Sequence, residues 1–296
     1  MTVLVTGATG LIGSEVVDAL LTAGAPVRVV TRQPDRVAFD PRVEVFAGDL
    51  SRPGDLTPVF AGVDRMFLFP MAAPELAGVA RAAGVERIVL LSSMNAAVEQ
   101  LRDPLHAPME AAVEASGARW THLRPGEFAH NKLRLWGESI RRRREVSWPD
   151  LPALASAPVH ERDVADLAAA ALLEDGHDRQ AYVVTGPAKL SVRDQIDAIG
   201  EVLGERLAHH VLDLRTAEAA LQARGGWPAA AGRAVLHLDR PDGAGPGDWL
   251  ADPRFAWMLE ASGDVERALG RPGRTFTQWV RDHAADFSPA GNPHPR

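Results

Sequence analysis

Three glycines near the N-terminus have the residue type and spacing needed to hold a phosphate group. Gly7, Gly10 and Gly13 follow the β-branched run Val3–Val5 and precede apolar residues with helical spacing. In such a turn the first glycine permits a tight bend, the second lets the backbone approach a phosphate, and the third lets the helix pack on the strand. The free amides at the start of that helix attract an anion. The pattern predicts a site for a dinucleotide pyrophosphate, with contacts from Gly7, Thr9, Gly10, Leu11, Ile12 and Gly13.

Two arginines follow the second apolar run, Val27–Val30, which ends in Thr31 and Arg32. A carboxylate at this place would bind the ribose 2′-hydroxyl of NAD, and none is present. An arginine instead suits the 2′-phosphate of NADP, because its guanidinium binds phosphate through two hydrogen bonds. Arg36 lies one helical turn further and could assist. NADP is therefore the favoured cofactor and NAD remains possible; the alternative is that both arginines are ordinary surface residues.

Short apolar runs alternate with helical patterns through the first half of the chain. Buried strands joined through helices require right-handed crossovers and a parallel sheet. The predicted fold class is therefore α/β, a doubly wound parallel sheet of Rossmann type with a smaller C-terminal substrate-binding region. The expected strands are Val3–Val5, Val27–Val30, Val43–Phe46, Met66–Phe69, Arg87–Leu91 and Trp120–Leu123, with helices at Leu56–Phe60, Pro74–Ala83 and Pro108–Ala115.

The alternation loosens after residue 125. A helix is expected at Glu161–Leu173, a late strand at Tyr182–Val184 and a serine-capped helix at Ser191–Leu203. The stretch 225–247, rich in Gly, Pro and Ala, is expected to be a loop. Arginines 141–144 are expected at a solvated helix end or loop, or alternatively against an anionic ligand. The expected parts are an NAD(P)-binding domain at 1–150, a mixed substrate region at 151–286 whose late elements return to the sheet, and a disordered tail at 287–296.

Composition excludes several classes of protein. The formal net charge is -7 and the 32 lysines and arginines are scattered, so no nucleic-acid partner is expected. Cysteine is absent, which excludes disulfides, a thiolate nucleophile and a cysteine-based metal centre, and no metal site is predicted. No apolar stretch approaches the roughly 18 residues that cross a bilayer, and the N-terminus lacks a basic targeting region. We expect a cytoplasmic protein, a monomer or homodimer, without a membrane partner.

Several longer motifs resemble the NmrA-like family of atypical short-chain dehydrogenases. They are VLVTGATGLIG at the start, AGDL at Ala47–Leu50, RIVLLSS at Arg87–Ser93, LRPGEF at Leu123–Phe128 and VHERDVA at Val159–Ala165. The resemblance covers roughly residues 1–205, and the family includes NAD(P)H:quinone reductase-like enzymes and a non-catalytic redox sensor. It implies that Asp49 binds the adenine amino group, with Leu50 against the ring. The alternative for Asp49 is an aspartate that caps a turn.

One part of the dehydrogenase pattern is missing. Catalytic short-chain dehydrogenases carry Tyr-x-x-x-Lys on the helix after the fifth strand, whereas here His106 and Glu110 occupy that spacing and the single tyrosine, Tyr182, lies in a late strand. Oxidation of ordinary alcohols is therefore not expected. Reduction of a quinone or extended aromatic enone is different, because it leaves a phenolate-like anion with a pKa of about 10. Donors such as Ser92 or Ser93 then suffice.

His106 is the other candidate proton donor, since histidine ionises near neutral pH. A capping or surface residue is the alternative. Because Pro104 and Pro108 bracket His106, we expect a loop or helix start without rigid positioning. On this interpretation His106→Ala costs less than about ten-fold in rate, or about 1.4 kcal/mol.

The substrate pocket is expected beyond the carboxyl ends of the strands, near the nicotinamide. The further cofactor contacts expected there are Phe69, Pro70, Ser92 and Pro125. The expected substrate contacts are Met71, Met94, Asn95, Phe128, His130, Trp136 and Trp148. Their large flat side chains favour a planar aromatic substrate. The predicted function is an NAD(P)H-dependent oxidoreductase acting on a quinone or polycyclic aromatic, as a tailoring step in secondary metabolism. The alternatives are a non-catalytic NAD(P)-binding sensor of a protein partner and a cofactor-assisted oxygenation.

Overall fold

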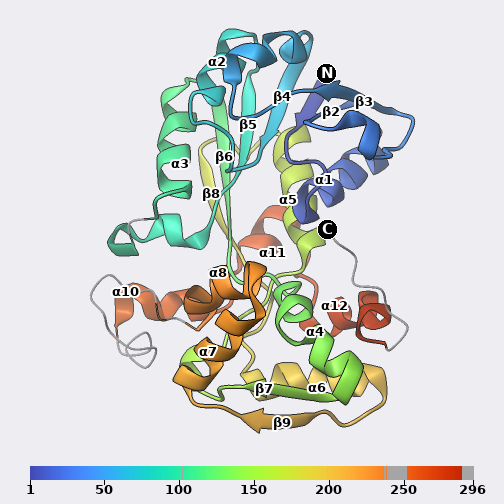
Figure 1. Ribbon diagram of the computed structural model, residues 1–296. Helices are drawn as coiled ribbons and strands as arrows, with labels where there is room; N and C mark the ends of the chain where they lie inside the picture. The colour runs from blue at the N-terminus through green and yellow to red at the C-terminus, as the bar shows by residue number, and fades with distance from the viewer. Residues whose placement is uncertain (102, 237, 239–251, 289–296) are drawn as a thin grey trace.

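The computed structural model of the chain describes residues 1–288 except 102, 237 and 239–251. Its larger lobe is built on a seven-stranded sheet with the order β3-β2-β1-β4-β5-β6-β8 (Figure 1). All pairings in this sheet are parallel, and the strand order reverses between β1 and β4. The predicted doubly wound parallel sheet is confirmed. The strands are β1 (Thr2–Val5), β2 (Val27–Thr31), β3 (Val43–Ala47), β4 (Val63–Leu68), β5 (Arg87–Leu91), β6 (Arg119–Pro125) and β8 (Gln180–Val184).

Helices cover both faces of this sheet, so its central strands are continuous apolar runs and do not alternate with polar residues. On one face lie α1 (Leu11–Thr22) and α5 (Glu161–Leu173), which share a buried core with Val3 and Val5. On the other face lie α2 (Leu76–Ala82) and α3 (His106–Ala115), around Leu4 and its neighbours. Short 3₁₀ segments complete the connections at Pro34–Arg36, Pro53–Phe60, Met94–Ala97, Glu99–Leu101, Pro152–Leu154, Trp257–Leu259 and Ala284–Phe287.

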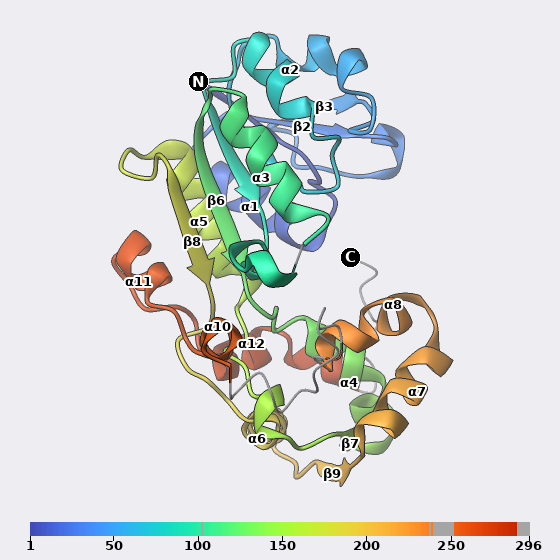
Figure 2. The same ribbon diagram turned by 90° about the vertical axis from the view of Figure 1, so that its left-hand side faces the viewer.

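A smaller lobe lies beyond the carboxyl ends of the strands (Figure 2). It is packed around buried aromatic and aliphatic side chains that include Trp136, Ile196 and Trp279. Its α4 and β7 fall within the expected 1–150 domain, yet they pack here because the chain leaves the large sheet at Pro125. The elements of this lobe are the parallel pair β7 (Glu145–Trp148) and β9 (Ala208–Val211), with α4 (Asn131–Arg143), α6 (Val192–Leu203), α7 (Leu214–Arg224), α8 (Gly226–Val235) and α12 (Phe276–Asp282). The short helix α10 (Pro253–Ala256) packs through Phe255 with Met94 and Val98, which follow β5 of the large sheet.

The chain returns from the smaller lobe to the large sheet. Helix α5 packs against α1, and β8 pairs with β6. The short helix α11 (Asp264–Leu269) then caps this edge, where the Val183 amide donates to Asp264 at 2.8 Å. These returns tie the two lobes together through several segments. Among the residues that the structure describes, no helix is both long and apolar enough to cross a bilayer.

Two expectations for the C-terminal third are wrong where the structure describes it. Part of the expected loop 225–247 is the helix α8 (Gly226–Val235), while 237 and 239–247 lie outside the described residues. Alanine is the strongest helix former, and Pro228 is tolerated because it lies in the first turn. The expected disordered tail begins with Phe287, which is fully buried and packs edge-on against Trp279. Residues 289–296 lie outside the described part.

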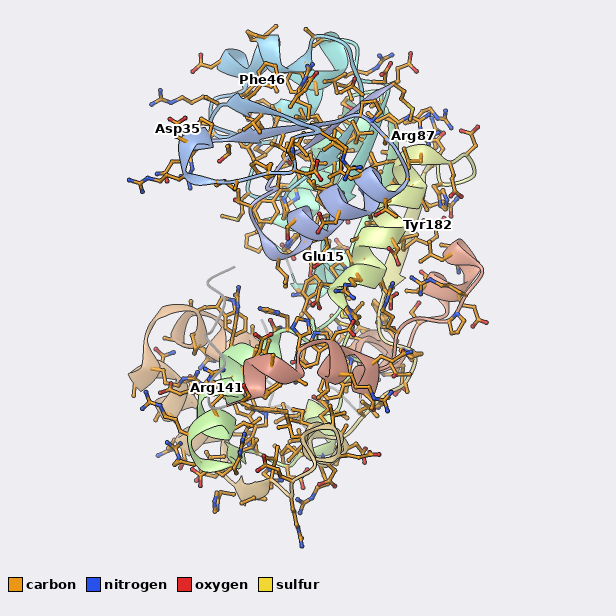
Figure 3. All side chains as sticks on the ribbon, turned by 90° about the vertical axis from the view of Figure 1, so that its right-hand side faces the viewer. Glu15, Asp35, Phe46, Arg87, Arg141 and Tyr182 are labelled. Atoms are coloured by element: carbon orange, nitrogen blue, oxygen red, sulfur yellow. The ribbon has the colours of Figure 1, made fainter. Side chains whose placement is uncertain are left out.

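The arginine run 141–144 forms the end of α4 in the smaller lobe, where Figure 3 labels Arg141. Arg141 donates to the backbone carbonyl of Asp286 at 2.8 Å, and Arg144 donates to that of Phe287 at 3.0 Å. Arg142 and Arg143 pair with neighbouring glutamates. The interpretation as a helix end is therefore supported, and Arg141 and Arg144 hold the 284–287 segment against α4.

Candidate active site

The glycine turn has the geometry of a phosphate cradle. Gly7 adopts φ +64°, and a Cβ there would lie 2.8 Å from the Phe69 ring. A Cβ on Gly13 would lie 2.1 Å from the Gly7 carbonyl oxygen. Gly10 is different, because the atom nearest to a Cβ added there would be the Gly7 carbonyl oxygen, at 3.3 Å. The protein itself thus requires Gly7 and Gly13 to be glycine, whereas Gly10 keeps space open beside the backbone.

The electrostatics of this turn favour a pyrophosphate. Gly10 is the N-cap of α1, so the amides that follow it have no partner within the helix. No acidic residue lies in the first turn of α1 to compete for them. The turn also lies where the strand order reverses, between β1 and β4, which is the usual dinucleotide crevice of such sheets. These residues fit NAD(P).

The loop after β4 is fastened to the glycine turn by Thr6. Its hydroxyl donates to the Phe67 carbonyl at 3.0 Å and accepts from the Phe69 amide at 2.7 Å. Phe69 therefore lies against Gly7, and Pro70 is buried beside it, in keeping with their expected place near the cofactor. Met71 is 65% exposed and does not line the cavity described below, so its expected contact with substrate stays a prediction.

The residues expected around the adenosine lie at the ends of β2 and β3. Arg32 and Arg36 are exposed. Asp49 accepts from the Ser51 amide at 2.9 Å and from the Ser51 hydroxyl at 2.8 Å, and these bonds hold the pKa of Asp49 below its usual value. The structure thus shows the turn-capping role of Asp49, which still leaves one carboxylate oxygen for another donor. Leu50 is half-buried against the core between the sheet and α2.

A cavity of about 780 Å³ lies beyond the carboxyl ends of β5 and β6. Its walls come from the 94–97 segment, the start of α3 and the 257–259 segment, whose Met258 and Leu259 pack with Met94, and from α4 and α8 of the smaller lobe. This volume is within the usual range for a small-molecule site. The predicted residues that line it are Ser93, Met94, Asn95, His106, Pro125 and Trp148.

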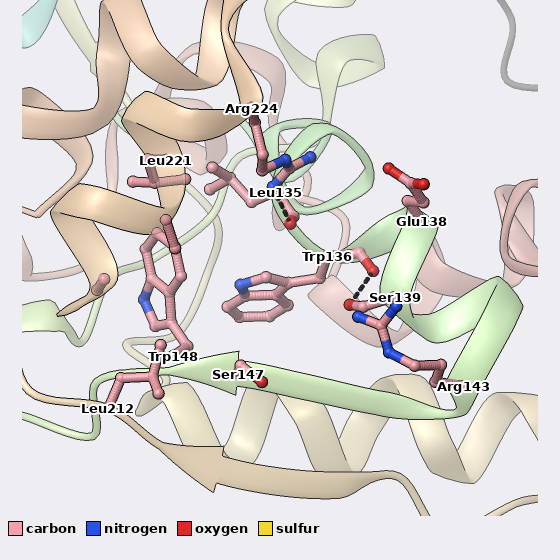
Figure 4. Close-up of a pocket in the computed structure, with 12 residues that line it drawn as sticks. Leu135, Trp136, Glu138, Ser139, Arg143, Ser147, Trp148, Leu212, Leu221 and Arg224 are labelled. Carbon is pink, nitrogen blue, oxygen red and sulfur yellow. Dashed lines mark hydrogen bonds between the residues drawn. The ribbon is translucent and has the colours of Figure 1, made fainter.

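Three further expected substrate contacts are absent from this cavity lining: Phe128, His130 and Trp136. Phe128 packs against the core around α1 and α5. Trp136 is buried in the smaller lobe, edge-on to Trp148, and borders a separate hollow of about 280 Å³ with Arg224 and Leu221 (Figure 4). His130 lies in a polar cluster treated below. The structure does not bring these three side chains into the cavity, because they face other elements, and their contact with substrate stays a prediction.

His106 is held in the cavity wall by Asp103. The Asp103 carboxylate accepts from the His106 amide at 2.8 Å, and its other oxygen lies 2.9 Å from Nδ1 of the His106 ring. Only 6% of the Asp103 side chain is exposed, against 22% for His106. Burial alone would raise the pKa of Asp103, but its hydrogen bonds with His106 and Leu105 hold it below the usual value. The expectation of loose positioning is therefore wrong: Asp103 fixes the ring.

Ser92 and Ser93 have different surroundings. Ser92 is buried and donates to Glu110 at 2.5 Å, while Arg124 donates to both oxygens of the same carboxylate at 2.9 and 2.7 Å. Burial would raise the pKa of Glu110, but the bonds from Arg124 and Ser92 lower it. The Ser92 proton is thus committed to a structural network. Ser93 lines the cavity, and its oxygen accepts from the Asn95 amide at 3.2 Å.

The sequence did not reveal three polar side chains that line the cavity, which are Glu127, Lys132 and Ser156. Lys132 is buried, donates to Glu127 at 2.7 Å and lies 4.8 Å from the centre of the Trp136 ring. Ser156 donates to the other Glu127 oxygen at 2.6 Å. These polar side chains face the cavity from α4 and from the 125–132 and 152–157 segments. The motif LRPGEF contained Glu127, but only the fold brings Ser156 to it. Asp103 was also missed, although an aspartate before a proline often initiates a turn.

The single tyrosine is excluded from the chemistry of this cavity. Tyr182 is buried in β8, and its hydroxyl lies 2.9 Å from Nδ1 of His177. Burial raises the pKa of Tyr182. Figure 3 shows it on the flank of the sheet beside α5, where it does not line the cavity. Tyr182 is therefore not placed to form a tyrosine–lysine pair at this cavity.

A family model described as NAD(P)H-binding matches residues 7–175, more than half of the chain. The chain belongs to this NAD(P)H-binding family. The resemblance to NmrA-like atypical short-chain dehydrogenases and the prediction of an NAD(P)H cofactor are thereby confirmed.

Two curated relatives of this family member match it over nearly the whole length. The (4-alkanoyl-5-oxo-2,5-dihydrofuran-3-yl)methyl phosphate reductase of Streptomyces griseus subsp. griseus is 34% identical and covers 97% of this chain and 99% of its own. The NAD(P)H azoreductase of Xenophilus azovorans is 32% identical and covers 97% of this chain and 100% of its own. Both are reductases, and the prediction of an oxidoreductase is confirmed.

Solved structures confirm the fold. The triphenylmethane reductase of Citrobacter sp. in complex with NADP(H) superposes with a TM-score of 0.76 at 20% identity, covering 96% of this chain and 100% of that one. The NADPH-dependent quinone oxidoreductase of Escherichia coli in complex with NADPH also superposes with a TM-score of 0.76 at 20% identity, and the match covers 95% of this chain and 99% of that one.

Proposed function

We propose that this chain is an NADPH-dependent reductase of a conjugated, electron-poor small molecule, with a quinone or polycyclic aromatic as the favoured substrate class. The observation that carries the proposal is the cavity of about 780 Å³ with the Asp103–His106 pair in its wall. This cavity lies at the same edge of the sheet as the glycine turn. An acceptor and a nicotinamide held at that edge would meet without crossing solvent.

The substrate class follows from the missing tyrosine. Reduction of an isolated ketone makes an alkoxide nearly as basic as hydroxide (water pKa about 16), which demands a strong acid at the reacting oxygen. Reduction of a quinone makes a phenolate-like anion with a pKa of about 10. The names of the relatives agree, since a ring enone conjugated with a carbonyl and an azo bond are both conjugated acceptors. A weaker proton donor then suffices.

The side chains of the cavity have separate roles in this proposal. Bound NADPH supplies the hydride. His106 delivers the proton to the product anion through Nε2, because Nδ1 faces the Asp103 carboxylate, which can only accept a hydrogen bond. Ser93 and Asn95 orient the oxygen of the acceptor, and the apolar walls around Met94 and Trp148 exclude water. The Lys132–Glu127 pair offers a polar contact to the far end of the substrate.

The expected result of a direct test is oxidation of NADPH by purified protein in the presence of an acceptor. The panel should contain benzo-, naphtho- and anthraquinones, an azo dye and an unsaturated lactone, with the rate proportional to protein concentration. Product mass separates simple reduction from oxygenation. Stoichiometric NADPH binding without turnover across the panel would reject the reductase and favour a sensor that regulates a protein partner.

The proposed preference for NADPH depends on Arg32. We expect NADPH to bind more tightly than NADH, and Arg32→Ala to reduce this preference about ten-fold, because a hydrogen bond to a charged group contributes about 1.5–3 kcal/mol. Titration of both cofactors by calorimetry measures the ratio. Arg81→Ala is the matched control, an exposed arginine at the end of α2. Equal binding of NADH and NADPH to the unmodified protein would make Arg32 an ordinary surface residue.

A further inference from the structure

A second cluster of titratable side chains lies where the smaller lobe meets the larger lobe. His130 precedes α4, Glu161 begins α5 and His283 ends α12. One ligand-type atom from each of these three side chains lies within 4.8 Å of the others. None of the three lines the substrate cavity. The sequence predicted no metal site, because residues so distant along the chain meet only in the folded structure.

Two buried side-chain atoms of this cluster have no hydrogen-bond partner. Nδ1 of His130 and Oε2 of Glu161 are both buried without a hydrogen-bond partner, and only 2% of Glu161 is exposed. Nδ1 of His160 lies 3.6 Å from that oxygen, beyond hydrogen-bond distance. This nitrogen accepts from the Arg162 amide at 3.2 Å and therefore presents a lone pair, not a proton. A buried carboxylate oxygen without a hydrogen-bond donor is costly unless a cation is present.

The remaining atoms are arranged as in a metal centre. Nε2 of His283 lies 2.5 Å from Oε1 of Glu161, while its Nδ1 lies 3.0 Å from a carboxylate oxygen of Asp286. A carboxylate behind a histidine is the usual support that orients a metal ligand and fixes its tautomer. A simple ion pair between His283 and Glu161 would satisfy only one of the two carboxylate oxygens of Glu161. It would leave the second oxygen and Nδ1 of His130 buried without a partner.

We propose that His130, Glu161 and His283 bind one divalent transition-metal ion, of which Zn²⁺ fits best. Two imidazoles and one carboxylate are a zinc-type ligand set, whereas Mg²⁺ and Ca²⁺ prefer oxygen ligands alone. Ligands at about 2.1 Å from zinc stand roughly 3.4 Å apart. The more distant ligand atoms of the cluster would therefore close by about an ångström, whereas Nε2 of His283 and Oε1 of Glu161, now 2.5 Å apart, would separate by about the same amount. Glu161 can supply both oxygens and so fill a fourth position. The ion would cross-link α4, α5 and α12, and so hold the smaller lobe against the large sheet (Figure 1).

The test uses the full chain without a histidine tag, stripped of metal with a chelator and titrated with Zn²⁺. The expected result is one bound equivalent and a rise in the thermal midpoint, and an intense visible absorption when Co²⁺ replaces Zn²⁺. His130→Ala is the decisive variant, because Nδ1 of His130 has no hydrogen-bond partner to lose. It should fold and lose the bound equivalent. Asp286→Asn should weaken Zn²⁺ binding about 10- to 100-fold.

His210→Ala is the matched control, because His210 is an exposed histidine that also pairs with a glutamate, Glu145. It should bind Zn²⁺ like the unmodified protein. Retention of the equivalent in folded His130→Ala, or a thermal midpoint that Zn²⁺ does not change in the unmodified chain, would overturn the metal site and leave a plain ion pair. These readouts do not depend on substrate turnover, so they are separate from the test of the proposed reductase.

Discussion

Gly10→Val should abolish useful NADPH binding while the protein stays folded. Gly10 has extended backbone angles, φ -90° and ψ 170°, which valine adopts readily. The nearest protein atom to its Cβ would be the Gly7 oxygen at 3.3 Å, so the fold needs only a small adjustment. The two methyl groups would instead occupy the space beside the free amides of α1. Loss of two hydrogen bonds to the pyrophosphate costs about 3 kcal/mol or more, roughly a hundred-fold or more in the dissociation constant.

Gly13→Val is the matched control, because it changes the same residue type three positions away. Its Cβ would lie 2.1 Å from the Gly7 oxygen and 2.6 Å from the Gly7 carbonyl carbon, both backbone atoms that cannot rotate away. This variant should therefore lose stability, by at least about 1–3 kcal/mol. The measurement pairs calorimetric NADPH titration with thermal unfolding. If Gly10→Val binds NADPH normally, the pyrophosphate lies elsewhere and the cofactor assignment of this turn is wrong.

The placement of the expected cofactor residues at one edge of the sheet was predictable, because each of them lies close to the end of a strand. Gly7, Asp49 and Phe69 each follow a strand of the sheet, and parallel strands end at one edge of it. Identifying the strands therefore placed these residues together without any knowledge of side-chain packing. The strands themselves were visible because helices cover both faces, which makes runs such as Arg87–Leu91 almost wholly buried.

The substrate half was harder to predict because it is assembled across the chain. Lys132 and Trp136 lie one turn apart on α4, yet Lys132 borders the cavity and Trp136 packs against Trp148 in the smaller lobe. No local sequence pattern distinguishes a residue that lines the cavity from one that packs in the core of the smaller lobe. The α8 residues of the cavity wall were assigned to a loop, since glycine and proline obscured a run of alanines. Aromatic type alone therefore did not identify the residues that line the cavity.

His106 illustrates how one missed residue changes a prediction. From sequence, Pro104 and Pro108 suggested a loosely held ring and an effect below ten-fold. In the structure, Asp103 accepts from the His106 amide and lies 2.9 Å from its ring, and its carboxylate is itself nearly buried. A ring fixed at Nδ1 presents Nε2 in one direction, as general acid catalysis requires. Since His106 lines the cavity, we now expect a larger effect of its removal.

His106→Ala should lower kcat about 10²- to 10⁴-fold while NADPH affinity stays unchanged, because the variant removes the proton donor and leaves the glycine turn intact. His106→Gln, which keeps the side chain polar but cannot transfer a proton, should behave like the alanine variant. Asp103→Asn should give a smaller loss, since it weakens the orientation of the ring and leaves the imidazole in place. Single-turnover measurements with saturating NADPH separate this chemical step from product release.

The size of the His106 effect should also depend on the acceptor. A quinone gives an anion with a pKa of about 10, which can take a proton from solvent, so part of the rate should survive in His106→Ala. An unsaturated lactone gives a more basic enolate, and its reduction should depend more strongly on His106. Added imidazole should restore part of the lactone activity by entering the space that His106 leaves in the cavity wall. A loss below about ten-fold with both acceptors would mean that no single acid dominates. The proton would then come from solvent or from Ser93, and Asp103–His106 would only cap the start of α3.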